Sequence, residues 1–152
     1  MAYLDWKDEL NTGISVIDGQ HKRIVTYINA LHELNQSDDG GDVTGIITAL
    51  VDYTISHFAF EESLLEDAGY KILTEHVHKH DVFRNKIYAF KKSAEAGEDV
   101  AGALLELLHD WLFGHILTED GQYVPVVSQY LDKLEADQNS GWLKKRVKDF
   151  FN

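Results

Sequence analysis

Residues 42–69 read DVTGIITALVDYTISHFAFEESLLEDAG, and their pattern gives the clearest indication of the fold. Its apolar residues recur at intervals of three and four, which predicts one long amphipathic helix. Asp42 is placed to cap the start of this helix, and Gly69 suits its C-terminal end. His57 and Glu61 are four residues apart, so they lie within about 40° of each other around the helix. Both continue the apolar stripe and therefore point toward the core.

Most of the chain shows the same helical spacing, and it contains a single proline, Pro125. Three further helices are predicted, running from Asp18 to the polar run at 37–42, from about Ile72 to Ala96, and from Asp99 through Leu112. Four helices of this length joined by short loops predict an all-α, up-down-up-down four-helix bundle.

Two segments flank the predicted bundle. Residues 3–16 have no clear period, so we expect an extended N-terminal arm laid against the body. Helical spacing continues past Pro125 to Leu134, and residues 142–152, WLKKRVKDFFN, place their apolar side chains on one helix face. We therefore expect a bundle domain over residues 1–135 and an amphipathic C-terminal extension over residues 136–152.

The composition excludes several classes of protein. The chain has 152 residues, 44% of them hydrophobic, which suits one compact domain. With 14 Lys and Arg against 26 Asp and Glu, its net charge of -12 repels nucleic acid and anionic membranes. The absence of cysteine excludes disulfides and thiolate metal sites. No secretory signal is visible and no segment approaches a membrane-spanning length, so we expect a cytoplasmic protein without a membrane span.

The tail at 142–152 differs in charge from the rest of the chain. It has four basic residues and one acidic residue, a net charge of +3, which leaves -15 for residues 1–139. We expect the tail to fold back on the acidic bundle, ahead of docking on a partner protein or a membrane surface.

Five of the eight histidines lie on apolar stripes. His76 and His80 point the same way because they are four residues apart, as do His57 and Glu61. His21 and His115 extend the stripes of the first and fourth helices. Burying five imidazoles and a carboxylate without a common partner costs several kcal/mol each, so a shared metal centre is the economical explanation.

The number of candidate ligands favours two metal ions. Five imidazoles and two carboxylates, Glu61 and an acid shortly after His115, are too many for one tetrahedral zinc and too rich in nitrogen for calcium or magnesium. At about six ligands for each ion, two bridging carboxylates and a bridging oxygen leave about one position open. A small molecule such as dioxygen can bind at an open position on a redox-active pair.

Four strings resemble those of the hemerythrins, in particular the single-domain bacteriohemerythrins. They are IDGQH (17–21), HFAFE (57–61), HVHKH (76–80) and WLFGHILTED (111–120), and their order and spacing match over roughly residues 3–131. The resemblance implies seven metal ligands: His21, His57, Glu61, His76, His80, His115 and Asp120. Helical spacing alone selects Glu119, four residues after His115, whereas the resemblance selects Asp120.

The resemblance further implies a non-haem pair of iron ions that binds dioxygen reversibly, for oxygen transport, storage or delivery. It implies three histidines on one iron (His76, His80 and His115), two on the other (His21 and His57), and Glu61 and Asp120 as bridges. An apolar lining of the oxygen pocket is expected from Ile24, Phe58, Trp111, Leu112 and Ile116. Glu62 lies about 100° around the helix from Glu61, so we expect it to be exposed.

Other functions have some support. A ferritin-like di-iron oxidase would use Glu-x-x-His pairs, which occur at Glu75 with His78 and at Glu106 with His109, but helical spacing places both pairs on polar faces. His32 lies about 16 Å along the first helix from His21, at the surface. A second alternative keeps the fold and makes it a sensor of oxygen or nitric oxide, or an iron-handling or repair protein, that acts through a partner. An enzyme is least supported, because the sequence shows no nucleophile with an adjacent base. We expect a monomer.

Overall fold

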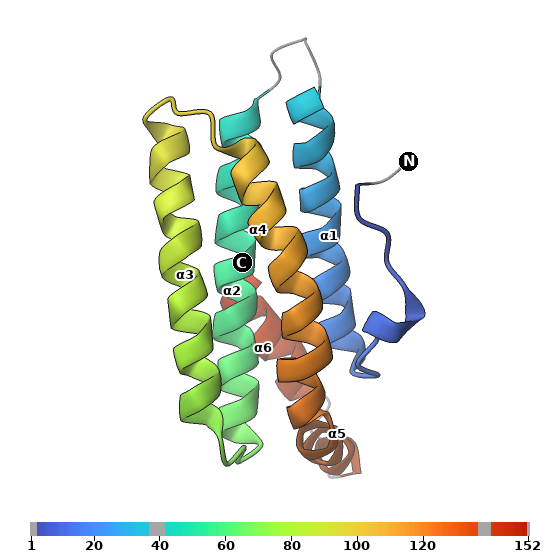
Figure 1. Ribbon diagram of the computed structural model, residues 1–152. Coiled ribbons are helices and arrows are strands. Elements are labelled where there is room, and N and C mark those ends of the chain that lie inside the picture. Colours follow the sequence, from blue (N-terminus) through green and yellow to red (C-terminus); the bar gives the residue numbers. More distant parts are fainter. Residues whose placement is uncertain (1–2, 37–41, 137–140, 152) are drawn as a thin grey trace.

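The computed structural model describes residues 3–36, 42–136 and 141–151. Four long helices lie side by side in it (Figure 1): α1 (Ser15–Gln36), α2 (Val43–Asp67), α3 (Leu73–Glu95) and α4 (Ala101–Gly114). Each helix runs in the opposite direction to the one before it. The predicted all-α, up-down-up-down bundle is therefore confirmed.

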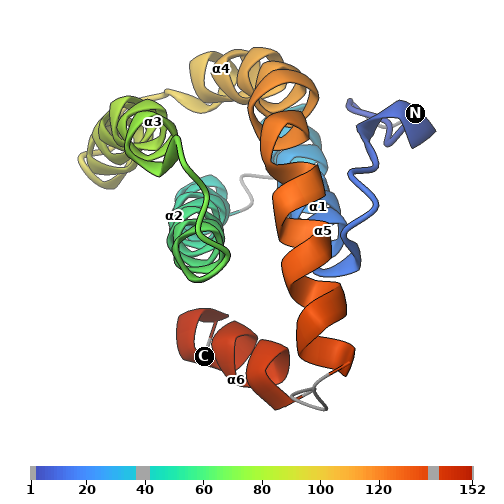
Figure 2. The same cartoon turned by 90° about the horizontal axis from the view of Figure 1, so that it is seen from below.

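The chain continues beyond α4 without a loop. A π-helical segment, η2 (His115–Asp120), leads directly into α5 (Gly121–Ala136), which contains Pro125. After α5 the chain turns back, and α6 (Gly141–Phe151) lies against α2 (Figure 2). Ahead of the bundle, the N-terminal arm holds one short 3-10 turn, η1 (Asp8–Leu10).

Local sequence explains where α2 and α3 begin and end. The Asp42 side chain accepts a hydrogen bond of 2.8 Å from the backbone N–H of Gly45 at the start of α2, as predicted. Gly69 and Gly97 follow α2 and α3 with φ of 74° and 90°, a left-handed conformation that glycine adopts without steric cost. The polar run expected to end α1 spans residues 37–42, and of these residues 37–41 lie outside the described residues.

Two predicted helix starts were wrong. α1 begins at Ser15 rather than at Asp18. The Asp18 carboxylate accepts hydrogen bonds from the backbone N–H groups of Thr12 and Gly13 and thereby holds the turn before the helix. α4 begins at Ala101 after an N-cap at Val100, so Asp99 does not cap it.

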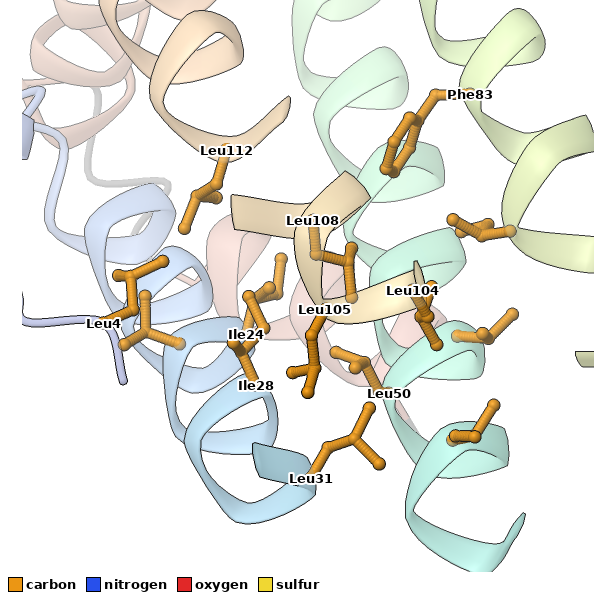
Figure 3. Packing of buried hydrophobic residues seen from close by; sticks show 14 of the residues in the cluster. Leu4, Ile24, Ile28, Leu31, Leu50, Phe83, Leu104, Leu105, Leu108 and Leu112 are labelled. Carbon is orange, nitrogen blue, oxygen red and sulfur yellow. The ribbon is translucent and has the colours of Figure 1, made fainter. Parts of the chain in front are cut away.

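The main core fills the interior of the bundle, where α4 packs beside α1 and α3, and α2 lies across from it (Figure 2). Leucines of α4 point from one side of this core toward Ile24 and Ile28 of α1 and Leu50 of α2 (Figure 3). The N-terminal arm adds Leu4, whose backbone N–H and C=O both bond to the Asn29 side chain, at 2.9 and 3.0 Å. The arm therefore lies against the body, as expected.

A second apolar cluster fills the end of the bundle beneath α6. Phe60 and Leu64 of α2 meet Tyr123 and Val127 of α5 there, and all four are buried. Rings of α6 cover this face: the centroid of Phe151 lies 5.1 Å from Tyr53, and that of Phe150 lies 6.2 Å from Phe60. The expected fold-back of the tail is thus what the structure shows, and aromatic rings make the contact. The side chains of Trp142, Lys144 and Arg146 lie outside the described residues.

One expectation about the membrane needs correction. α2 is long and apolar enough, with a hydropathy of 1.3, to meet the length and composition of a membrane-spanning helix. The core helix of a soluble protein meets the same test, so this is weak evidence. α2 contributes buried residues to both apolar clusters, which accounts for its composition.

Candidate metal centre

The structure brings all seven predicted ligands together inside the bundle. His21 comes from α1, the other six come from α2, α3 and η2, and none of the seven exposes more than 5% of its surface. The seven are His21, His57, Glu61, His76, His80, His115 and Asp120. Each long helix of the bundle, or its direct continuation, therefore supplies at least one polar group to a common interior point.

The ligand atoms form two groups that share one carboxylate. In each group the atoms lie within 4.8 Å of one another. The first group is His21, His57, Glu61, His115 and Asp120, and the second is Glu61, His76 and His80. Such an arrangement suits two neighbouring cations with Glu61 between them.

His115 stands between the two groups. Its Nε2 lies 3.1 Å from Asp120 Oδ1 and 3.9 Å from Glu61 Oε2, which places it in the group of His21 and His57. The centroid of its ring, however, is 5.3 Å from that of His80 and 5.8 Å from that of His21. Its assignment to the same iron as His80 therefore stays a prediction.

Several buried ligand atoms lack the hydrogen bonds that burial normally demands. Among the residues that the structure describes, no hydrogen-bond partner is found for the Nε2 atoms of His21, His57 and His80 or for either oxygen of Asp120. His21 Nε2 lies only 3.0 Å from Asp120 Oδ2, but without hydrogen-bond geometry. Leaving a buried polar group unsatisfied costs about 1–3 kcal/mol. A cation at the point where these atoms converge would satisfy them together, so the residues present fit a metal.

The π-helical segment explains why Asp120 is the second carboxylate. A π-helix bonds residues five apart, whereas an α-helix bonds residues four apart. His115 and Asp120 are the first and last residues of η2, and both face the centre. Helical spacing alone selected Glu119, whose side chain lies outside the described residues. The chain continues through η2 directly into α5.

The electrostatics of the centre suit a cation. Burial lowers the pKa of His57 to about 4, so the imidazole is neutral near pH 7, as metal binding requires. Burial alone would raise the pKa of Glu61, but the neighbouring imidazoles of His57, His76 and His80 hold it well below the ordinary value. For His80, burial lowers the pKa, but the nearby carboxylates of Glu61 and Glu62 outweigh burial, and the pKa is raised. Glu61 is therefore a carboxylate ringed by imidazoles.

Three outer residues hold the ligands, and sequence reasoning missed them. Gln20 Oε1 lies 2.7 Å from His57 Nδ1, and Glu62 Oε2 lies 2.7 Å from His80 Nδ1. The hydroxyl of the fully buried Tyr123 donates to Glu61 Oε2 at 3.1 Å. We predicted that Glu62 is exposed, but its side chain is only 20% exposed and contacts the ligand His80. The only sequence signal for these partners is their place one to three residues from a ligand.

An apolar wall surrounds the ligands. Of the five predicted lining residues, Ile24, Phe58, Leu112 and Ile116 are buried and Trp111 is half-buried. Phe58 stacks on the His80 ring with centroids 4.1 Å apart, and Trp111 stacks on the His115 ring at 4.6 Å. Phe83, absent from the prediction, extends this wall by stacking on Trp111 at 4.3 Å. Their role as an oxygen pocket stays a prediction.

The other histidines lie away from the centre. His78 is exposed, and His109 exposes 43% of its side chain and faces Asp110 at the surface. His32 is half-buried beneath Tyr3, whose ring stacks on it at 4.5 Å. The Glu-x-x-His pairs of a ferritin-like site therefore do not reach the interior.

Comparison with known proteins agrees with this geometry. Residues 12–127 match a family model described as the hemerythrin HHE cation binding domain. The chain belongs to the hemerythrin family. All seven candidate ligands of this hemerythrin-family chain lie within the matched residues.

Similar proteins carry the same family name. Those named bacteriohemerythrin include one from Pseudomonas paraeruginosa, 47% identical, and one from Stenotrophomonas maltophilia, 42% identical, each matched over 99% of both chains. A crystal structure of wild-type hemerythrin is similar with a TM-score of 0.79 and 29% identity, and covers 84% of this chain and 99% of its own. The resemblance to single-domain bacteriohemerythrins is thus confirmed, and the family is one of diiron, oxygen-binding proteins.

Proposed function

We propose that this hemerythrin-family chain holds two iron ions in the buried centre and binds dioxygen there reversibly, to carry, store or deliver it. One observation carries the proposal: buried ligand atoms without hydrogen-bond partners converge from α1, α2, α3 and η2 beside the shared Glu61. The family description as a cation binding domain and the name bacteriohemerythrin of the relatives support it.

The seven converging residues would hold the iron. Glu61 belongs to both ligand groups and would be shared by the two ions. Asp120 belongs to the group of His21, His57 and His115, and the resemblance to hemerythrins supports it as the second shared carboxylate. The five imidazoles would complete the set: His21, His57, His76, His80 and His115. Iron ions held by these residues would supply a redox-active pair able to bind dioxygen.

The surrounding residues keep the centre dry and its ligands oriented. Phe58 and Trp111 cover the faces of two ligand rings, which excludes water from that side. Gln20 and Glu62 accept hydrogen bonds at Nδ1 of His57 and His80, so that Nε2 of each ring faces the centre. Tyr123 restrains Glu61 by donating to its Oε2.

We further propose that the protein is a cytoplasmic monomer that acts as a binding protein rather than an enzyme. An enclosed centre lined by packed aromatic rings suits a small ligand such as dioxygen better than a larger substrate. The relatives named bacteriohemerythrin support a role in binding oxygen.

Optical spectroscopy with iron analysis tests the function. Purified protein is reduced without air, exposed to dioxygen, purged, and cycled again. The proposal predicts two irons for each chain and a charge-transfer band that rises with oxygen and disappears on purging in every cycle. If the band does not form again when dioxygen is readmitted after purging, reversible binding is contradicted and a sensor is favoured. Iron far above two ions for each chain would favour an iron-handling role.

A further inference from the structure

Two ligand histidines of the centre have unlike partners at their outer nitrogens. His80 Nδ1 lies 2.7 Å from a carboxylate oxygen of Glu62, and His57 Nδ1 lies 2.7 Å from the neutral amide oxygen of Gln20. The two rings belong to different ligand groups, which share only Glu61. The centre is therefore asymmetric beyond its ligands, with a formal negative charge behind one imidazole and none behind the other.

Both partners fix which nitrogen carries the proton. A carboxylate and an amide oxygen only accept hydrogen bonds, so Nδ1 of each ring must be the donor. This leaves Nε2 of His80 and of His57 as the basic atoms, and each lies 3.3 Å from an oxygen of Glu61. An imidazole that donates to a carboxylate is a more basic metal ligand than one that donates to a neutral oxygen.

Glu62 is itself held in place by Arg84. The guanidinium of Arg84 donates to the same Glu62 oxygen that faces His80, and its other nitrogen donates to Asp81. The guanidinium also lies 5.4 Å from the centroid of the Phe58 ring, which stacks on His80. With side chains of Arg84 and Glu62 only 17% and 20% exposed, the pair is more restrained than an ion pair in open solvent.

We propose that Glu62, oriented by Arg84, is a positioning residue that makes His80 a stronger metal ligand than His57. It thereby gives the two metal positions unequal affinity. The proposal rests on the two-cation centre proposed above. The simpler reading is that Glu62 and Arg84 only tie α2 to α3, in which case metal binding does not sense the charge of Glu62.

Titration with Zn²⁺ against a competing chelator separates these readings. Glu62→Gln keeps the shape of the side chain and removes its charge. It is expected to weaken one of two Zn²⁺ binding steps by about 10–100-fold and leave the other unchanged. Glu66→Gln, the same change at an exposed position four residues along α2, is the matched control and is expected to titrate like the wild type.

The reciprocal variant keeps the test decisive if Glu62→Gln folds poorly. Gln20→Glu places a carboxylate behind His57 and is expected to strengthen the other Zn²⁺ step. Nuclear magnetic resonance of the Zn²⁺-loaded protein gives a second readout, because Glu62→Gln is expected to shift the Nδ1 proton of His80 and leave that of His57 in place.

The outcomes are distinguishable. If wild-type protein binds Zn²⁺ in two steps but both variants titrate like it, the asymmetry is refuted and the two-cation centre stands. Equal weakening of both steps by Glu62→Gln also refutes the asymmetry, because that is the effect of a loosened α2–α3 contact. A wild type that binds two Zn²⁺ ions with equal affinity refutes the asymmetry alone, whereas binding of fewer than two Zn²⁺ ions would overturn the two-cation centre of the proposed function.

Discussion

Replacing Tyr123 with phenylalanine tests whether the outer residues restrain the centre. The change removes one hydroxyl, which donates to Glu61 Oε2 at 3.1 Å, and leaves the ring in its apolar cluster. A hydrogen bond to a charged group contributes about 1.5–3 kcal/mol. Both partners are fully buried, so water cannot replace the lost donor. We expect metal-free Tyr123→Phe to lose about 2 kcal/mol of unfolding free energy, which lowers Tm by about 4–8 °C in a protein of this size.

Urea unfolding followed by circular dichroism measures this loss. Tyr88→Phe is the matched control, because Tyr88 is 44% exposed and its change is expected to stay within about 0.5 kcal/mol of zero. Combining Tyr123→Phe with Glu61→Gln completes a double-mutant cycle, in which a direct bond gives a coupling above about 0.5 kcal/mol. Restraint of Glu61 by the Tyr123 hydroxyl is refuted if Tyr123→Phe is as stable as Tyr88→Phe, or if the effects of Tyr123→Phe and Glu61→Gln are additive.

Three further predictions concern the ligands, the tail and a helix cap. His57→Ala should abolish iron binding and the stabilisation that iron gives, because the free energy of metal binding contributes to the free energy of folding here. The controls His78→Ala and His109→Ala should match the wild type in iron content and Tm. Loss of iron from either control would revive a ferritin-like site. Burial raises the pKa of Tyr53 to about 12, and the Phe151 ring of α6 packs on Tyr53. Removal of α6 should therefore lower the pKa of Tyr53 toward 10, measured by ultraviolet titration with Tyr53→Phe as the reference. An unchanged pKa would show that α6 does not cover this ring in solution. Asp42→Ala should cost about 1 kcal/mol in urea unfolding, since it removes the N-cap bond of α2, and no measurable loss would contradict that cap.

The sequence predicted the fold well because the bundle depends on local rules. Helical spacing identifies which face of each helix is apolar, and Gly69 and Gly97 mark ends that need a left-handed residue. The errors in the predicted fold lie at the starts of α1 and α4, where an acidic side chain can accept hydrogen bonds from other groups than the N–H groups of the helix. Asp18 looks like a cap in the sequence but instead binds Thr12 and Gly13.

The inward direction of the five histidines could also be predicted, because positions four apart share a face. Asp120 could not be derived from spacing, since an α-helical count selects Glu119 and only the π-helical turn brings Asp120 beside His115. The resemblance to hemerythrins supplied that residue.

The outer partners escaped prediction for a different reason. Angular position on one helix shows whether a side chain points inward, but not which group on a neighbouring helix it meets. Glu62 points sideways from α2, and only the packing of α3 places His80 and Arg84 within its reach. Tyr123 similarly reaches Glu61 only because α5 continues from η2 across the end of the bundle.

Anaerobic addition of ferrous iron to metal-free protein, with the bound iron counted, shows directly whether the buried centre holds two cations. The wild type is expected to bind two irons for each chain, and Glu61→Ala fewer than one, because Glu61 is the residue that both ligand groups share. Binding of one iron or none by the wild type, or retention of two by Glu61→Ala, would contradict a pair of cations joined by this carboxylate.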